Sequence, residues 1–199
     1  MRSSKTERTR EHIIAATAPV FNRKGYAGTS ITDLTQATKL TSGSIYGNFE
    51  NKEEVALAAF DFNLESVHSV VQRAVNKCKT TKEKLMMSVL AYHSSQRLSF
   101  PGGGCPMQNT LTEADDSHEG LRLRAAQGLL RWKKDLMELI NTGIAEKVIV
   151  ADTDAEKIAL HVIALIEFGF LISSATRDRK EVDKILDLAV GILSKTFVA

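Results

Sequence analysis

Catalysis and metal binding need nucleophilic, titratable or metal-ligating side chains at fixed spacings, and this chain offers few such sets. Its five histidines, His12, His68, His93, His118 and His161, show no paired metal-ligand spacing. Glu65 and His68 form one i, i+3 pair, whereas a di-iron helical bundle needs that pair twice. There is no Gly-x-Ser-x-Gly elbow, and the glycine triplet at 102–104 lacks the Gly-Lys-Ser/Thr ending of a phosphate-binding P-loop. These patterns predict a protein that is not an enzyme and that needs neither a metal nor a cofactor.

One run of small polar residues fits a different chemistry, the recognition of a polyanion. The run TSGSIYGNFENKEEV begins at Thr41, a residue that can cap a very short helix. Ser42 and Ser44 then lie at the N-terminal end of that helix, where short side chains and backbone amides can reach base edges or phosphates. Gly43 leaves the backbone bare for close approach. The spacing predicts a short helix that is presented to the major groove of a nucleic acid.

Apolar and aromatic residues in the same run would brace that helix. Ile45 and Phe49 are expected to point inward and to hold it against the two preceding helices. Tyr46 can keep its ring on that core while its hydroxyl reaches a phosphate. Two short helices joined by a tight turn, after a bracing helix and with basic flanks, predict a helix-turn-helix. A purely structural helical corner is the alternative.

Composition favours a helical globular chain with a basic N-terminal part. The 199 residues are 43% hydrophobic, with three prolines and no runs of alternating β-branched residues. The net charge is only +2, but residues 1–52 carry eight Lys/Arg against four acids, and the remainder carries 18 against 20. Such asymmetry favours a polyanion-facing N-terminal part joined to a neutral body.

Hydrophobic periodicity and capping signals predict an all-α fold of about nine helices. The expected ranges are 6–24, 31–38, one turn from 41, a long helix after Asn51, 81–98, 106–115, 117–146, 154–175 and 179–197. Gly25 suits the end of the first helix, although Pro19 inside it predicts a kink. Ser30 followed by Asp33 predicts a capping box before the second helix.

The expected compartment is a reducing cytoplasm. Cys78 and Cys105 lie in different predicted elements without a CxxC motif, so neither a zinc site nor a disulfide framework is indicated. The first residues lack the apolar region of a signal peptide. The most apolar stretch, residues 158–172, is short for a membrane span and contains His161 and Glu167, so a buried helix is expected and no membrane partner.

The N-terminal quarter of the chain resembles the TetR/AcrR family of repressors. The resemblance rests on REHIIAATAPVFNRKGYAGTSITDLTQATKLTSGSIYGNFENKEEV, with an Ala-rich helix ending in Phe and Gly-Tyr, a Thr-Ser start and a Gly-x-x-Tyr-x-x-Phe-x-x-Lys run. Its landmarks are Ala15, Ala16, Phe21, Gly25, Tyr26, Thr29, Ser30, Gly43, Tyr46, Phe49 and Lys52. The segment PGGGCP is similar to a Gly-Gly-Cys-Pro segment of some branches of this family.

The resemblance implies a set of DNA contacts, with Lys52 on a phosphate. The set comprises Ser30, Lys39, Thr41, Ser42, Gly43, Ser44, Tyr46, Asn48 and Lys52. Two positions depart from the family pattern. Lys39 stands where glycine is common, so it needs a left-handed backbone at a cost of about 1 kcal/mol or more, while adding a charge near DNA. Asn48 stands where histidine is common, and its amide offers both a donor and an acceptor.

The resemblance also implies an architecture and partners. Residues 6–66 would form the DNA-binding domain and residues 67–199 a ligand-binding and dimerisation domain. The last two helices would pair with their copies in a homodimer that binds a near-palindromic double-stranded DNA operator. A small-molecule effector would bind in a cavity formed by the fourth to seventh helices and release the repressor from DNA. The candidate ligand-binding residues are Tyr92, His93, Cys105, Met107, Asn109, Trp132 and Phe168.

Three alternatives stay open. Cys105 begins a helix and could be a redox or electrophile sensor, or could serve an enzyme with His93 or His118 nearby. The structural alternative, which the sequence favours, is a small residue packed at a tight turn. A transcription activator of the same fold is the third alternative.

Overall fold

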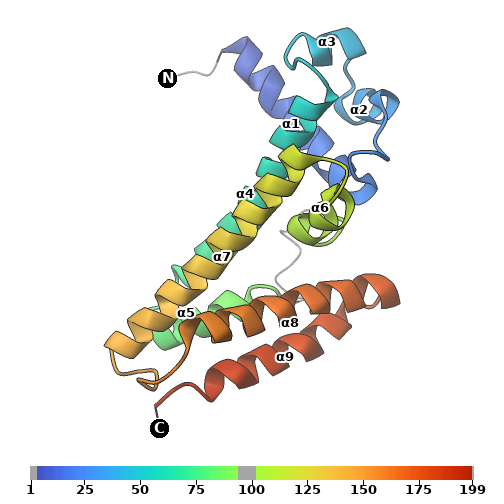
Figure 1. Cartoon of the computed structure of the whole chain (residues 1–199). Coiled ribbons are helices and arrows are strands. Elements are labelled where there is room, and N and C mark those ends of the chain that lie inside the picture. The colour runs from blue at the N-terminus through green and yellow to red at the C-terminus, as the bar shows by residue number, and fades with distance from the viewer. Residues whose placement is uncertain (1–3, 94–101, 199) are drawn as a thin grey trace. The chain divides into compact units, whose positions relative to one another are not determined.

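The computed structural model describes residues 4–93 and 102–198, which fold into nine α-helices (Figure 1). The helices are α1 (Lys5–Lys24), α2 (Ile31–Thr38), α3 (Ser42–Tyr46), α4 (Lys52–Val75), α5 (Thr81–Leu90), α6 (Pro106–Ala114), α7 (Glu119–Ala145), α8 (Ala155–Thr176) and α9 (Lys180–Ser194). Within these residues one isolated β-bridge joins Ile149 to Phe197. The expected all-α class with about nine helices is confirmed.

Two helices end earlier than the periodicity predicts. The fifth ends at Leu90, because the N–H groups of Tyr92 and His93 bond to carbonyls three residues back and tighten the chain into turns. The expected continuation to residue 98 is therefore wrong as far as His93, and the rest of that range lies outside the described residues. The last helix ends at Ser194 because the following residues pair with residues 148–150.

The helix α1 runs unbroken through Pro19. Proline removes the N–H that would bond to the carbonyl of Ala15. Ala15 is exposed, so water can satisfy that carbonyl. Gly25 ends the helix with φ of 72°, as its position predicts.

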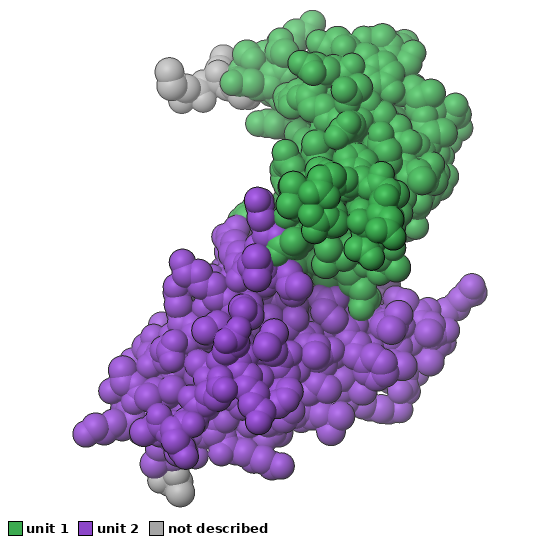
Figure 2. Space-filling view, viewed as in Figure 1, with its two compact units in different colours: residues 1–66, 101–126 green, residues 67–100, 127–199 purple. Residues whose placement is uncertain are grey.

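The chain divides into two compact units, drawn in different colours in Figure 2. The first comprises residues 1–66 and 101–126, and its core joins α1 to α4 through nine buried residues: Ile13, Ala18, Phe21, Leu34, Ile45, Phe49, Val55, Ala56 and Ala59. A division between the two units falls between residues 66 and 67. The expectation that 67–199 is one body is corrected, because 101–126 belongs to the first unit and bonds there to the end of α1.

The second unit comprises residues 67–100 and 127–199, and the pair α8–α9 dominates it. The buried side of α9 carries Val182, Leu186, Ala189 and Leu193. The two helices approach closely at Gly169, where a Cβ atom would lie 2.9 Å from Cγ2 of Val182. Larger residues at Gly169 would therefore push the two helices apart.

The helix α8 contains the apolar stretch and is longer than that stretch suggests. It has 22 residues with a mean hydropathy of 2.0 in its most apolar window, so by length and composition alone it could cross a membrane. The core helix of a soluble protein passes the same test of length and composition. Only 33% of that window is buried in the single chain, and Leu160, Phe168 and Leu171 are exposed. The helix thus has cover on one side and an apolar surface on the other.

Candidate nucleic-acid interface

The short helix α3 is held in place from both ends. The Oγ1 atom of Thr41 accepts a hydrogen bond from the N–H of Ser44 at 3.1 Å, which is the expected N-cap. Ile45 is fully buried, and Phe49 just beyond the helix is 2% exposed. A helix of five residues has little stability of its own, so the Thr41 cap and the buried side chains of Ile45 and Phe49 hold it in place.

Lys39 forms the turn between α2 and α3. Its backbone is left-handed, with φ of 59° and ψ of 25°, as the sequence predicts for a residue in a glycine position. Next to it, the hydroxyl of Thr38 donates to the carbonyl of Leu34 and accepts from the N–H of Leu40. The Nε2–H of His12 donates to the carbonyl of Thr38 at 2.9 Å. These bonds tie the turn to α1, while the Lys39 side chain is exposed.

The N-terminal end of α3 presents small polar groups to solvent. Thr41, Ser42 and Gly43 are exposed, and Ser44 is half-buried. A Cβ atom at Gly43 would have no neighbour closer than 4.0 Å, so the space in front of this backbone is open. The side chain of Tyr46 is 40% exposed. The structure therefore brings Thr41, Ser42 and Gly43 together at the N-terminal end of α3, and Tyr46 is the last residue of the helix.

Two predicted contact residues also serve the fold. The Ser30 hydroxyl accepts a hydrogen bond from the N–H of Asp33, and the Asp33 carboxylate accepts one from the N–H of Ser30 at 2.9 Å, which forms the expected capping box. The amide of Asn48 donates to the carbonyl of Ser44 at 2.9 Å. The oxygen of that amide remains the acceptor it can offer to a ligand.

Arg10 braces the base of α3 and was missed by the sequence reasoning. Its guanidinium donates to the carbonyl of Asn48 and to the carboxylate of Glu54, and it lies 4.0 Å from the centroid of the Phe49 ring. Arg10 stands three residues before Ile13, so extending the helical stripe by one turn would have placed it beside the core.

Two carboxyl groups near this face have lowered pKa values. The Lys24 ammonium, 2.6 Å from Asp33, and the N–H and hydroxyl of Ser30 lower the pKa of the Asp33 carboxyl. The N–H of Glu50 and then the Arg10 guanidinium lower the pKa of Glu54. Both acids thus remain paired within the fold.

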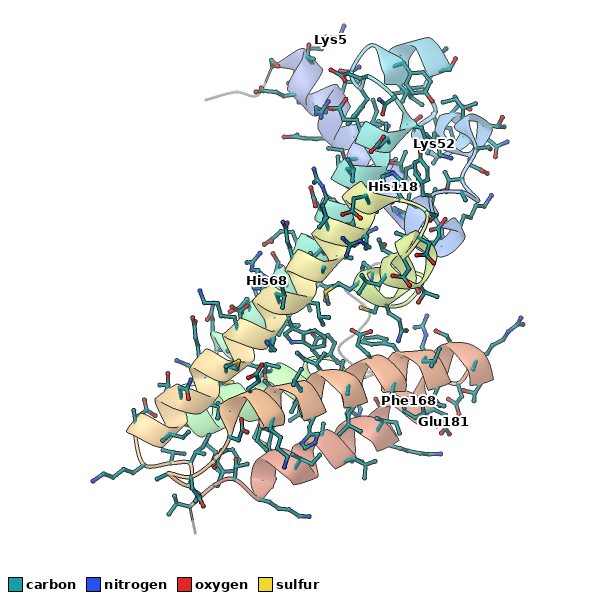
Figure 3. All side chains as sticks on the ribbon, viewed as in Figure 1. Lys5, Lys52, His68, His118, Phe168 and Glu181 are labelled. Carbon is teal, nitrogen blue, oxygen red and sulfur yellow. The ribbon has the colours of Figure 1, made fainter. Side chains whose placement is uncertain are left out.

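Lys52 lies at the start of α4 on the ring of Tyr26 (Figure 3). Its Nζ atom is 4.3 Å from the ring centroid. The ring of His118 meets Tyr26 edge-on with centroids 4.6 Å apart, and Nε2 of His118 is 3.7 Å from Oε1 of Glu53. Among the residues that the structure describes, the ammonium of Lys52 thus contacts an aromatic face and forms no salt bridge.

Some candidate ligand-binding residues form an aromatic cluster in the second unit. Tyr92 lies 5.6 Å from Trp132 and 6.0 Å from Phe170, measured between ring centroids. Phe170 was not predicted, although it carries the third ring of the cluster. His93 follows Tyr92 in sequence, and its Nε2 atom lies 3.4 Å from Oδ2 of Asp183.

The other candidates are placed differently. The ring of Phe168 is half-exposed on α8 (Figure 3). Cys105, Met107 and Asn109 belong to the first unit, where the cysteine and methionine are buried. The amide of Asn109 donates to the carbonyl of Asn22 at 3.0 Å. In the part of the chain that the structure describes, no group of three or more His, Cys, Asp or Glu is placed to hold a metal ion.

Comparisons with known proteins identify both parts of the chain. The family described as "Bacterial regulatory proteins, tetR family" matches residues 13–59. The family described as "Tetracyclin repressor-like, C-terminal domain" matches residues 81–188.

Relatives and solved structures agree with these matches. A TetR-family transcriptional regulator from Cytophaga hutchinsonii is 49% identical, with all of both chains covered and a TM-score of 0.94. A TetR regulator from Chloroflexus aurantiacus is 32% identical over 97% of this chain and 98% of its own, with a TM-score of 0.90. The HTH-type transcriptional repressor DhaR of Mycobacterium sp. (strain GP1) is 24% identical over 92% of this chain and 91% of its own.

Proposed function

Since the chain belongs to the TetR family of bacterial regulatory proteins and is a helix-turn-helix transcriptional regulator, we propose that it represses its target genes from a near-palindromic operator until a small molecule binds. Repression is favoured over activation because a relative matched over nine-tenths of both chains is named a repressor. A cytoplasmic protein that binds double-stranded DNA fits this role, and nothing in the comparisons supports the enzyme alternative at Cys105.

The observation that best supports sequence-specific DNA binding is that α3 buries one side chain in the core and exposes small polar groups to solvent. Ile45 is fully buried, while Ser42 and Gly43 are exposed at the helix N-terminus beside the exposed ring of Tyr46. Short polar side chains and open backbone suit close approach to base edges and phosphates. Lys39 before α3 and Lys52 after it in sequence add positive charge to this part of the chain.

A homodimer through α8 and α9 is supported by the apolar surface on this pair. Leu160, Phe168 and Leu171 on α8 and Leu188 on α9 are each about half-exposed in the single chain. Monomeric soluble proteins rarely leave large apolar patches uncovered. A second copy of the same helix pair covers such a face in a self-complementary way.

Release by a small molecule is supported by the aromatic cluster of the second unit. Tyr92, Trp132 and Phe170 offer ring faces of the kind that line ligand sites. An effector releases DNA only if it binds the released form more tightly than the DNA-bound form. Trp132 is the sole tryptophan of the chain, so its fluorescence reports binding near this cluster.

The test is selection of duplexes from a randomised DNA pool by the purified protein. We expect enrichment of a near-palindrome, and we expect Tyr46→Ala to lose it. Lys52→Ala should weaken binding across sequences and make the salt dependence of log K shallower by about one phosphate contact. Enrichment that depends on salt but not on sequence would contradict the proposal.

A further inference from the structure

The carboxylate of Glu113 on α6 grips the turn that leads into α2. Its Oε2 atom accepts a hydrogen bond from the backbone N–H of Tyr26 at 2.9 Å, and Oε1 accepts one from the N–H of Ala27 at 2.8 Å. Two successive amides thus point at one anion. Hydrogen bonds to a charged acceptor are stronger than neutral ones, so this fork fixes the local backbone.

Gly25 is the residue type that the Glu113 contact requires. The residue has φ of +72°, and a Cβ atom there would lie 2.2 Å from Oε2 and 2.5 Å from Cδ of Glu113. Glycine therefore supplies both the backbone conformation and the space that the carboxylate occupies. The same turn is closed by Thr29, whose hydroxyl donates to the carbonyl of Gly25 at 2.6 Å. Ser30, the N-cap of α2, follows directly.

A second polar contact anchors α6 to the end of α1. The amide of Asn109 donates to the carbonyls of Asn22, at 3.0 Å, and Gly103, at 2.7 Å. In return, the amide of Asn22 donates to the carbonyl of Gly102 at 2.9 Å. Asn22 is 7% exposed, so the contact is sheltered from water. These hydrogen bonds fix α6 against the end of α1, and α6 in turn positions Glu113 at the turn.

The segment that carries Glu113 also reaches the start of α4. Beyond α6, His118 packs against the Tyr26 ring, and that ring in turn lies under the Lys52 ammonium. Along the chain, the helices α2 and α3 lie between the turn at 25–29 and the start of α4. Nε2 of His118 also lies 3.7 Å from Oε1 of Glu53 at the start of α4, so residues 106–118 contact the chain at both ends of the helix-turn-helix.

From these contacts we infer that Glu113 is a positioning residue for DNA binding: its carboxylate sets the turn from which α2 and α3 start, so operator affinity depends on it. A carboxylate is repelled by phosphate and is unsuited to touch DNA itself. The inference rests on the proposed DNA-binding function and adds to it a residue outside residues 1–66.

The test exploits the sign of the effect. Removing a negative charge from a DNA-binding protein strengthens binding on electrostatic grounds alone. Glu113→Gln removes that charge but also replaces one of the two acceptor oxygens with an amide that faces an N–H. We expect about tenfold weaker binding to the duplex enriched by the wild-type protein, measured by fluorescence anisotropy at fixed salt. The salt dependence should not change, and hydrogen exchange at the amides of Tyr26 and Ala27 should accelerate.

Glu119→Gln is the matched control. Glu119 is an exposed carboxylate on α7 that accepts bonds from Arg122 at 2.7 and 2.8 Å, so this variant loses the same charge and a comparable pairing. It should bind DNA as tightly as the wild type or more tightly. Weakening equal to that of Glu113→Gln would overturn the inference, because the loss would then not be particular to the turn.

Glu113→Asp guards against a variant that fails to fold. It keeps the charge but is one methylene shorter, so it cannot reach both amides, and we again expect weaker binding. If either Glu113 variant is folded by circular dichroism and binds as tightly as the wild type, the inference is refuted. A wild-type protein that enriches no duplex would instead refute the proposed function, so the two failures are distinguishable.

Discussion

Replacing Lys39 by glycine should stabilise the protein while weakening its hold on DNA. Lys39 ends α2 with φ of 59° and ψ of 25°, and its N–H bonds to the carbonyl of Thr35 at 2.9 Å. A non-glycine residue in this region costs about 1–2 kcal/mol. The greater freedom of glycine in the unfolded chain offsets about 0.5–1 kcal/mol of that gain. We therefore expect the free energy of unfolding of Lys39→Gly to rise by up to about 1.5 kcal/mol.

The effect on DNA has the opposite sign because the Lys39 ammonium is exposed beside α3. Loss of one phosphate contact makes the slope of log K against log salt shallower by about 0.9. Lys39→Arg keeps both the charge and the backbone strain, so it should match the wild type in both measurements. Lys39→Asn tolerates the left-handed backbone and lacks the charge, so it should behave like the glycine variant.

Urea unfolding followed by circular dichroism, at one protein concentration for all variants, measures the stability term. Anisotropy titrations of the selected duplex at several salt concentrations measure the DNA term. A Lys39→Gly variant less stable than the wild type would refute the strain reasoning. An unchanged salt slope would refute the phosphate contact, whatever the stability.

Three further changes test other parts of the structure. Ile45→Ala empties a fully buried site and should lower the free energy of unfolding by about 2–5 kcal/mol in urea titrations; a loss below 1 kcal/mol would contradict the anchoring of α3. The Lys24 ammonium lowers the pKa of Asp33, so this carboxylate stabilises the folded chain above its unfolded pKa of about 3.9, and the benefit is lost as pH falls below that value. Unfolding titrations from neutral to acid pH should therefore show a shallower acid loss for Asp33→Asn than for the wild type, and identical profiles would speak against the pairing. Phe168→Glu places a charge on the exposed face of α8 and should shift sedimentation from dimer to monomer; an undisturbed dimer would mean that another surface joins the copies.

The helix starts in the first half of the fold were predictable because each is set by a capping residue close by in sequence. Ser30, Thr41 and Asn51 each accept a bond from an N–H three residues ahead, and each stands where the periodicity starts. The left-handed backbone of Lys39 was predicted from the family resemblance instead, because glycine is common at that position. Local rules suffice where the stabilising partner is a near neighbour in sequence.

The supports of the DNA-facing helices were not predictable because their partners are far apart in sequence. Arg10 bonds to residues 38 and 44 positions away, and Glu113 bonds to amides 87 and 86 positions away. No periodicity relates such positions. The same limit separates the predicted ligand residues, because Asn109 and Tyr92 fall in different compact units although both lie near the middle of the chain.

The arrangement of α3 bears on how such a protein acquires a new operator. Ser42 and Gly43 meet solvent, whereas Ile45 fills the core two residues later. Substitutions at the exposed pair leave the packing intact and change only the chemical surface offered to the groove. Descendants of one ancestral gene can therefore drift apart in operator preference by changing single codons at these positions, without first gaining the stability needed to tolerate a disturbed core.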